Sequence, residues 1–229
     1  MSTTVSVAPR EIHDLAYRAC CVAGCDAGIA ERIAHNVAFA EIHHGGAVRA
    51  FCEALETTAL PTSAWVTAPD ALAAAELAAR DRGTASVTFE PPVPLAAIAG
   101  TLQQSLERGV ASTGADADAR AYTTVSAIEL RLEAEPNGEA VARAARERSE
   151  HERETSGAAT GQSANPRRLS ADDPAASARL ELIDDARANA YRYGIAVEQA
   201  WFSRLEAAAA GYLVAESTLD EIDSRPGVA

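Results

Sequence analysis

The chain of 229 residues carries a net charge of −13 and contains no lysine, so all 20 of its basic side chains are arginine. An acidic surface repels phosphate backbones and anionic lipid headgroups, which argues against binding to nucleic acid and against docking on membranes. The lack of lysine excludes enzymes that use a lysine Schiff base, a P-loop lysine or a lysine general base.

Hydrophobic residues make up 48% of the chain and aromatic residues 5%, which is typical of a globular protein with an alanine-rich core. Met1–Arg10 lacks the charged and then apolar pattern of a secretory signal. No run approaches the length of about 18 apolar residues that a membrane-spanning helix needs. We therefore expect a bacterial, cytoplasmic protein with reduced cysteines, folded as a single domain over residues 1–229.

Three short helices are expected to form an antiparallel module over residues 9–60. Pro9 suits the first turn of a helix, and Asp26 is suited to cap the next one. The Gly45–Gly46 pair breaks the chain before the third helix. The expected ranges are 1–8 for a loose lead-in and 9–23, 26–44 and 47–57 for the helices.

Residues 61–153 are expected to combine a small mixed sheet with helices. Alternating apolar residues predict strands at Thr84–Glu90 and Ala121–Ala134. The second strand has an apolar face only in its second half, so we expect it to be exposed or at a sheet edge. The other expected segments are a short strand at 63–67, helices at 70–80, 95–108 and 138–154, and a polar loop at 111–120.

The C-terminal part is expected to be a pair of helices behind a flexible segment. Residues 154–176 are rich in Ser, Gly, Ala and Pro, a composition typical of flexible chain. Within 177–229, the expected segments are a brief strand at 178–183 and helices at 184–193 and 197–212. The sequence thus predicts an α+β fold with an N-terminal helical module, a small mixed sheet with helices, and a C-terminal helical pair.

The four cysteines lie in the N-terminal module, close to four of the five histidines. Cys20-Cys21-x3-Cys25 does not have the two-hook spacing of a structural zinc site. A metal site would need Cys21 or Cys25 to meet His43, His44 or Cys52 across helices. Cysteine also serves as a small buried hydrophobe beside alanines, and we favour this interpretation, with no metal site.

Two carboxylate pairs and one aromatic pair have ordinary structural explanations. Asp172–Asp173 and Asp184–Asp185 each open or precede an expected helix, so N-capping explains them better than metal binding does. Trp201–Phe202 is expected to pack in the core.

His43 and His44 stand where the second helix ends, and two interpretations of them are open. An imidazolium at a helix C-terminus faces the negative end of the helix dipole, which is a purely structural role. Alternatively, His43 or His44 donates a proton or contacts an anion, with Arg49 binding a carboxylate beside it. The free N–H groups at the start of the third helix would favour the same anion.

Part of this region resembles the malate/L-lactate dehydrogenase family that does not use a Rossmann fold. The matching residues are Ala30, Ala34, Ala40-Glu41-Ile42, His44-Gly45 and Arg49. In that family a Ser-His-Gly turn and a following arginine lie at the active site, which implies catalytic and substrate-binding roles for His44 and Arg49. Here His43 replaces the serine, the arginine is one residue further along, and the family's later cofactor-binding motifs are missing, so the cofactor is unknown.

Both ends of the chain are similar to an uncharacterised bacterial family of about the same length. The resemblance rests on Glu11-Ile12, Gly28-x-Ala30-Glu31, Gly194-Ile195-x-Val197 and Trp201-x3-Leu205. It implies a single domain over the whole chain and transfers no activity.

Two functions from different classes follow. The first is a non-catalytic subunit or interaction domain of a cytoplasmic bacterial enzyme complex, with another protein chain or a second copy as partner. The second is a small-molecule enzyme that acts on a carboxylate or amide through His43, His44 and Arg49, with a dehydrogenase as the example that the first resemblance implies. A pocket that holds Arg49 in contact with either imidazole would favour the enzyme, whereas burial of that surface against another chain would favour the subunit.

Overall fold

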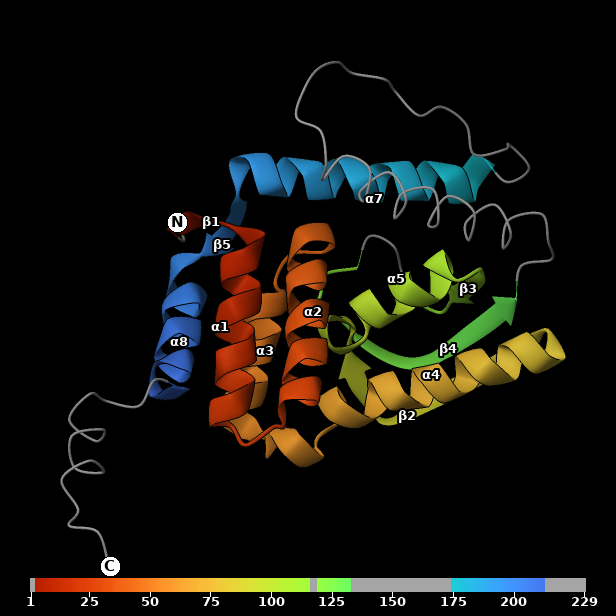
Figure 1. Ribbon diagram of the computed structural model, residues 1–229, viewed down its shortest axis with the longest axis horizontal. Helices are drawn as coiled ribbons and strands as arrows, with labels where there is room; N and C mark the ends of the chain where they lie inside the picture. Colours follow the sequence, from red (N-terminus) through yellow and green to blue (C-terminus); the bar gives the residue numbers. More distant parts are fainter. Residues whose placement is uncertain (1–2, 116–118, 133–173, 213–229) are drawn as a thin grey trace, which may run out of the picture.

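The structure is a computed structural model that describes residues 3–115, 119–132 and 174–212. It confirms the expected α+β class: helices stand toward both ends of the described chain and combine with one sheet of two strands and one of three (Figure 1). The predictions for 138–154, for residues 154–173, which include Asp172–Asp173, and for the tail after 212 lie outside the described residues.

The N-terminal helices are α1 (Pro9–Val22), α2 (Ala27–His43) and α3 (Ala47–Thr57), as the sequence predicts. Asp26 caps α2 by accepting a hydrogen bond of 2.9 Å from the backbone N–H of Ile29. The expected lead-in is wrong in part, because Thr4–Val7 forms strand β1. This strand pairs antiparallel with β5 (Ile195–Glu198), almost two hundred residues further along the chain.

Helix α4 (Ala64–Arg82) begins earlier than expected, so the predicted strand at 63–67 is wrong. Ser63 is the N-cap, and its hydroxyl accepts a hydrogen bond from the N–H of Trp65. Trp65 and Val66 are buried. A short apolar run of this kind fits the first turn of a helix as well as a strand.

The larger sheet has the order β2-β4-β3, so the strand that we expected at an edge lies in the centre. Its members are β2 (Thr84–Pro94), β3 (Val110–Thr113) and β4 (Thr124–Leu132). Val110–Thr113 overlaps the predicted polar loop and covers the second edge of β4. Helix α4 packs against β2 and β4, and α5 packs against β3 (Figure 1).

The expected helix at 95–108 divides into a 3-10 turn (Leu95–Ala97) and helix α5 (Ala99–Glu107). Gly100, in the first turn of α5, lies against α2. A Cβ atom on Gly100 would stand 2.8 Å from Cδ2 of His35 and 2.9 Å from Oδ1 of Asn36. The missing side chain therefore allows α5 to approach α2 closely.

Helix α7 (Pro174–Tyr193) runs through the predicted strand at 178–183, so that prediction is wrong. Asp184 and Asp185 lie inside this helix and are not its N-cap. After β5 the chain forms α8 (Gln199–Ala209) and a 3-10 turn, η3 (Ala210–Tyr212). In Figure 1, α7 lies across the end of the helical layer where α2 finishes, and it contacts α2.

A continuous hydrophobic cluster joins the N-terminal helices, the three-stranded sheet and α8. Its largest fully buried side chains include Phe51, Ile33, Leu72, Ile128 and Leu205. As expected, Phe202 belongs to this cluster and Trp201 packs against it. Cys20, Cys25 and Cys52 are buried within it, which fits their use as small hydrophobes.

Candidate ligand pocket

The start of α3, which we expected to attract an external anion, is capped by the chain's own carboxylate. Glu41, only 5% exposed, accepts hydrogen bonds from the backbone N–H groups of Gly46 at 3.1 Å and Val48 at 2.8 Å. A carboxylate at a helix N-terminus satisfies the unpaired donors and faces the positive end of the dipole. The anion site at this position is therefore already filled from within.

His44 joins the end of α2 to the segment before β4. Its Nδ1 atom lies 3.1 Å from the carbonyl oxygen of Ala119. Burial lowers the pKa of His44, and the hydrogen bond to Ala119 partly offsets that effect. This imidazole has a structural contact and does not line the pocket described below.

Arg49 lies against Trp201 of α8 and does not line the pocket described below. Its Nε atom donates a hydrogen bond of 2.9 Å to Glu53, and its guanidinium lies 5.2 Å from the ring centre of Tyr122 and 5.7 Å from that of Trp201. The structure thus keeps His43 and His44 adjacent but places only His43 in a pocket, with Arg49 outside it.

His43 lies in a different place, at a cavity of about 430 Å³ between α1, α2, α5 and α7. Cavities of this size hold small organic ligands. The lining contains three histidines, two arginines, two carboxylates, two amides and an apolar set. It consists of Pro9, Arg10, His13, His35, Ala38, Phe39, Ile42, His43, Gln103, Gln104, Glu107, Asp184, Arg187 and Tyr191.

The helical repeat of α2 explains the floor of the pocket. His35, Phe39 and His43 follow one another at intervals of four residues, so they share one face of the helix. Ala38 on the same face is buried, and the His43 ring packs on Phe39 with a centroid distance of 4.2 Å. The floor is therefore made of apolar side chains and imidazole rings.

Charged side chains surround the mouth of the pocket. Arg10 on α1, Glu107 on α5, and Asp184 and Arg187 on α7 are all exposed. Asp184 and Arg187 are three residues apart, so they lie on the same side of α7. The pocket thus has an apolar and imidazole floor and a mouth with charges of both signs.

The imidazoles of the floor are neutral at pH 7. Burial, followed by the charges of His44 and Arg187, lowers the pKa of His43 to about 4. Burial also lowers the pKa of His35, with a further contribution from His13. The side-chain amide of Gln104 stands 3.2 Å from Nε2 of His35 and can donate to this nitrogen when the other ring nitrogen carries the proton.

One ring nitrogen of His43 lacks a partner. Its Nε2 atom is buried and forms no hydrogen bond with any described residue. A buried polar atom without a partner costs about 1–3 kcal/mol. Because this nitrogen is buried, a rotation of the ring that exposes it to the cavity would allow a bound molecule to relieve the cost.

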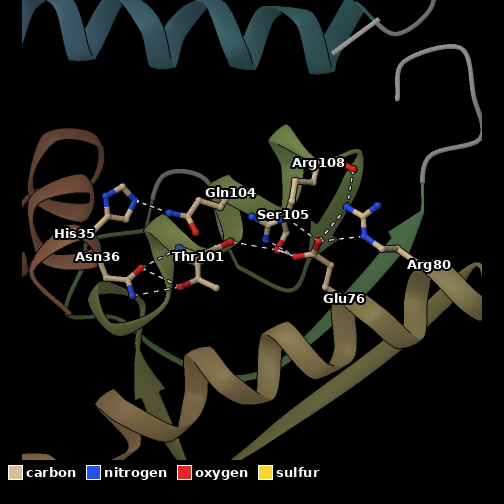
Figure 2. A network of polar contacts seen from close by, with 8 residues as sticks. All are labelled: His35, Asn36, Glu76, Arg80, Thr101, Gln104, Ser105 and Arg108. Carbon is tan, nitrogen blue, oxygen red and sulfur yellow. Dashed lines mark hydrogen bonds and ion pairs between the residues drawn. The ribbon is translucent and has the colours of Figure 1, made fainter. Parts of the chain in front are cut away.

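A polar network holds α5, and with it Gln104 and Glu107, against α2 and α4 (Figure 2). Asn36 of α2 accepts a hydrogen bond of 2.8 Å from the N–H of Thr101. The Glu76 carboxylate of α4 bonds to Arg108, Ser105 and Arg80. Arg108 is the main cause that lowers the pKa of Glu76 to about 2. One wall of the pocket is therefore fixed by buried charge-assisted bonds.

Within residues 3–115, 119–132 and 174–212, no group of three or more His, Cys, Asp or Glu side chains is arranged to hold a metal ion. No helix in these ranges is long and apolar enough to cross a membrane.

Comparison with known proteins identifies no relative: no family model, curated protein or solved structure matches this chain. The two family resemblances of the sequence therefore stay predictions.

Sequence reasoning found His43 but missed most of its surroundings. The four-residue spacing of His35, Phe39 and His43 was a signal that could have indicated a common face on α2. Nothing local could have added Arg187 and Tyr191, because α7 reaches α2 only through the tertiary fold.

Proposed function

We propose that this protein binds a small organic carboxylate in the pocket between α1, α2, α5 and α7. The observation that carries the proposal is the combination of an apolar floor, neutral imidazoles and two arginines in one cavity. We propose binding and no reaction, because only His43 of the three expected site residues lines the pocket.

The arginines supply recognition of the carboxylate. A guanidinium presents its N–H donors in a planar fork that matches the two oxygens of a carboxylate. Arg10 and Arg187 approach the mouth from different helices, α1 and α7. A carboxylate at the mouth would contact either guanidinium without being fully removed from water, which keeps its desolvation cost low.

The floor supplies affinity for the rest of the molecule. Phe39, Ile42 and Ala38 offer apolar surface, and burial of such surface stabilises by about 25 cal/mol per Å². The neutral rings of His35 and His43 add hydrogen-bonding nitrogens without adding charge. A compact molecule with an apolar body and a carboxylate at one end is complementary to both regions.

Titration calorimetry with 3-phenylpropanoate at pH 7 and low salt tests the proposal. We expect binding to the wild-type protein, and a loss of affinity of about two- to five-fold in Arg187→Gln, because one exposed charge pair disappears. Arg192→Gln is the matched control: Arg192 is on the same helix, stacks on Tyr193 and does not line the pocket. Equal loss in both variants, or no binding to the wild type, would contradict the proposal.

A separate surface favours the first function suggested by the sequence, that of an interaction domain or subunit. Arg49 and Arg204 stack on Trp201, and Arg49 also lies over Tyr122, whose side chain is 46% exposed. Trp, Tyr and Arg are the residues most enriched at the energetic centres of protein interfaces. A cytoplasmic bacterial enzyme complex is the setting we proposed from the sequence.

Native mass spectrometry of the untagged protein from its own host tests this second candidate. A partner chain at fixed stoichiometry that is lost in Tyr122→Ala would support it. A lone chain in both forms would remove it, and the ligand proposal would be unaffected.

A further inference from the structure

We infer that the ligand of this pocket is a zwitterion that carries an amine beside its carboxylate, as an α-amino acid with an apolar side chain does. The inference rests on the proposed function and adds the chemical class of the ligand. It is based on the charges of both signs at the mouth, which a simple carboxylate does not use.

The four charged residues of the mouth do not neutralise one another. The ion pairs found among the described residues include none of Arg10, Glu107, Asp184 and Arg187. The Glu107 carboxylate accepts one hydrogen bond of 3.3 Å from the Gln103 amide and forms no ion pair with a described cation, although its charge raises the pKa of the neighbouring Arg108. Two positive and two negative groups therefore face the cavity.

The positive and the negative side chains of the mouth act on the same part of the pocket. Glu107 raises the pKa of His35, while Arg187 lowers it, so both fields reach the ring of His35. Asp184 and Arg187 stand one helical turn apart on α7, a spacing of about 5–6 Å between Cβ atoms. The amine and the carboxylate of an α-amino acid are separated by a single carbon, which suits neighbouring charges of opposite sign.

Each simpler ligand leaves a mismatch. A monocarboxylate satisfies Arg10 and Arg187 but faces Glu107 and Asp184, and like charges at close range disfavour binding. A simple amine satisfies Glu107 and Asp184 but faces Arg10 and Arg187. Only a molecule with both groups places each charge opposite its complement, with its apolar side chain on Phe39 and Ile42.

Three probes with one apolar body test the inference by titration calorimetry at pH 7: L-phenylalanine, 3-phenylpropanoate and 2-phenylethylamine. We expect L-phenylalanine to bind about ten-fold more tightly than either of the others. L-leucine, 4-methylpentanoate and 3-methylbutylamine form a second set with the same expected order, so the result does not depend on one side chain.

Substitutions of the two carboxylates at the mouth test whether they bind the amine of the ligand. Glu107→Gln and Asp184→Asn are each expected to weaken L-phenylalanine about three- to five-fold and to leave 3-phenylpropanoate unchanged or tighter. Asp185→Asn is the matched control, because Asp185 is the exposed neighbour on α7 that does not line the pocket.

The outcomes separate this inference from the proposed function. If 3-phenylpropanoate binds as tightly as L-phenylalanine and Arg187→Gln weakens it, the carboxylate site stands and the zwitterion is wrong. If Glu107→Gln and Asp184→Asn change the affinity for L-phenylalanine and for 3-phenylpropanoate equally, the proposed contact between the amine and these carboxylates is wrong. If no member of either set binds, both proposals fail.

Discussion

At the scale of single residues, Glu41 decides what the end of α2 can do. It stands five and seven residues before the backbone donors that it binds, Gly46 and Val48, on the far side of a glycine break. In the sequence it is one more helix-forming residue, whereas Asp26 stands directly before its helix and could be recognised as a cap. Capping by a residue from the preceding helix has no short sequence signature, which is why the expected anion site was misplaced.

Glu41→Gln is expected to lower the free energy of unfolding by about 1–2 kcal/mol, measured by urea denaturation at pH 7. The amide keeps one acceptor but loses the second acceptor and the charge that faces the helix dipole. Glu53→Gln is the control, because Glu53 is 44% exposed and pairs with Arg49 at the surface, where such a pair contributes about 0.5 kcal/mol. Equal effects of the two substitutions would show that Glu41 is not a buried cap.

At the scale of the elements, the sequence predicted those features that depend on neighbouring residues, such as helix caps and helix breaks. The Asp26 cap, the Gly45–Gly46 break and helix α3 were predicted because each depends on neighbouring residues. The pairing of β1 with β5 and the central place of β4 depend on contacts between distant segments, so the sequence did not reveal them. The run at 178–183 fits a strand and a helix equally, and its helical neighbours settle the choice.

The close approach of α5 to α2 depends on Gly100, and Gly100→Ala is expected to destabilise the protein by about 1–3 kcal/mol. Alanine has the better helix propensity by about 1 kcal/mol, but its Cβ would meet His35 and the Asn36 oxygen that Thr101 holds in place. The shift of α5 should also weaken ligand binding, because α5 carries Glu107 and Gln104. Thermal unfolding and the titrations described above measure both effects.

Gly28→Ala is the matched control for this prediction. Gly28 is in the first turn of α2, where an added Cβ meets only Asp26 Oδ1 at 3.4 Å. That substitution is expected to be neutral or slightly stabilising. A stabilising Gly100→Ala would mean that α5 is not closely packed on α2.

At the scale of the whole molecule, one core connects elements from both ends of the chain, and the pocket lies where α1, α2, α5 and α7 meet. Ser6 of β1 donates a hydrogen bond to the carbonyl of Tyr193, and Gln199 donates its N–H to Thr3. The start of the chain thus anchors the end of α7, which carries Arg187 and Tyr191. A substitution that weakens these contacts should therefore change both the stability of the protein and the shape of the pocket.

The pH dependence of stability follows from the buried imidazoles. Below pH 6.5 the unfolded chain takes up a proton at His43 that the folded chain binds only near pH 4, so lowering the pH over this range favours unfolding. We expect His43→Gln to flatten the fall in unfolding free energy between pH 6.5 and 4 by about 1–2 kcal/mol. An unchanged slope would show that His43 is not held neutral in the fold.

Glu76 provides the control, because it acts in a lower pH range. Its folded pKa of about 2 lies below the ordinary 4.5, so its stabilising contribution is complete above pH 4.5 and is lost as the pH falls toward 2. Glu76→Gln should lower stability at pH 7 and leave the slope between pH 6.5 and 4.5 unchanged.

The nitrogen-15 signals of the histidine rings would show directly whether the floor of the α1–α2–α5–α7 pocket is a binding surface. Nitrogen-15 spectra of the imidazoles, assigned with single His→Gln variants, would be followed while 3-phenylpropanoate is added at pH 7. We expect the signals of His35 and His43 to move with one saturating curve, while those of His44, bonded to Ala119, stay in place. Signals that do not move at saturating concentrations, or an equal shift at His44, would contradict it.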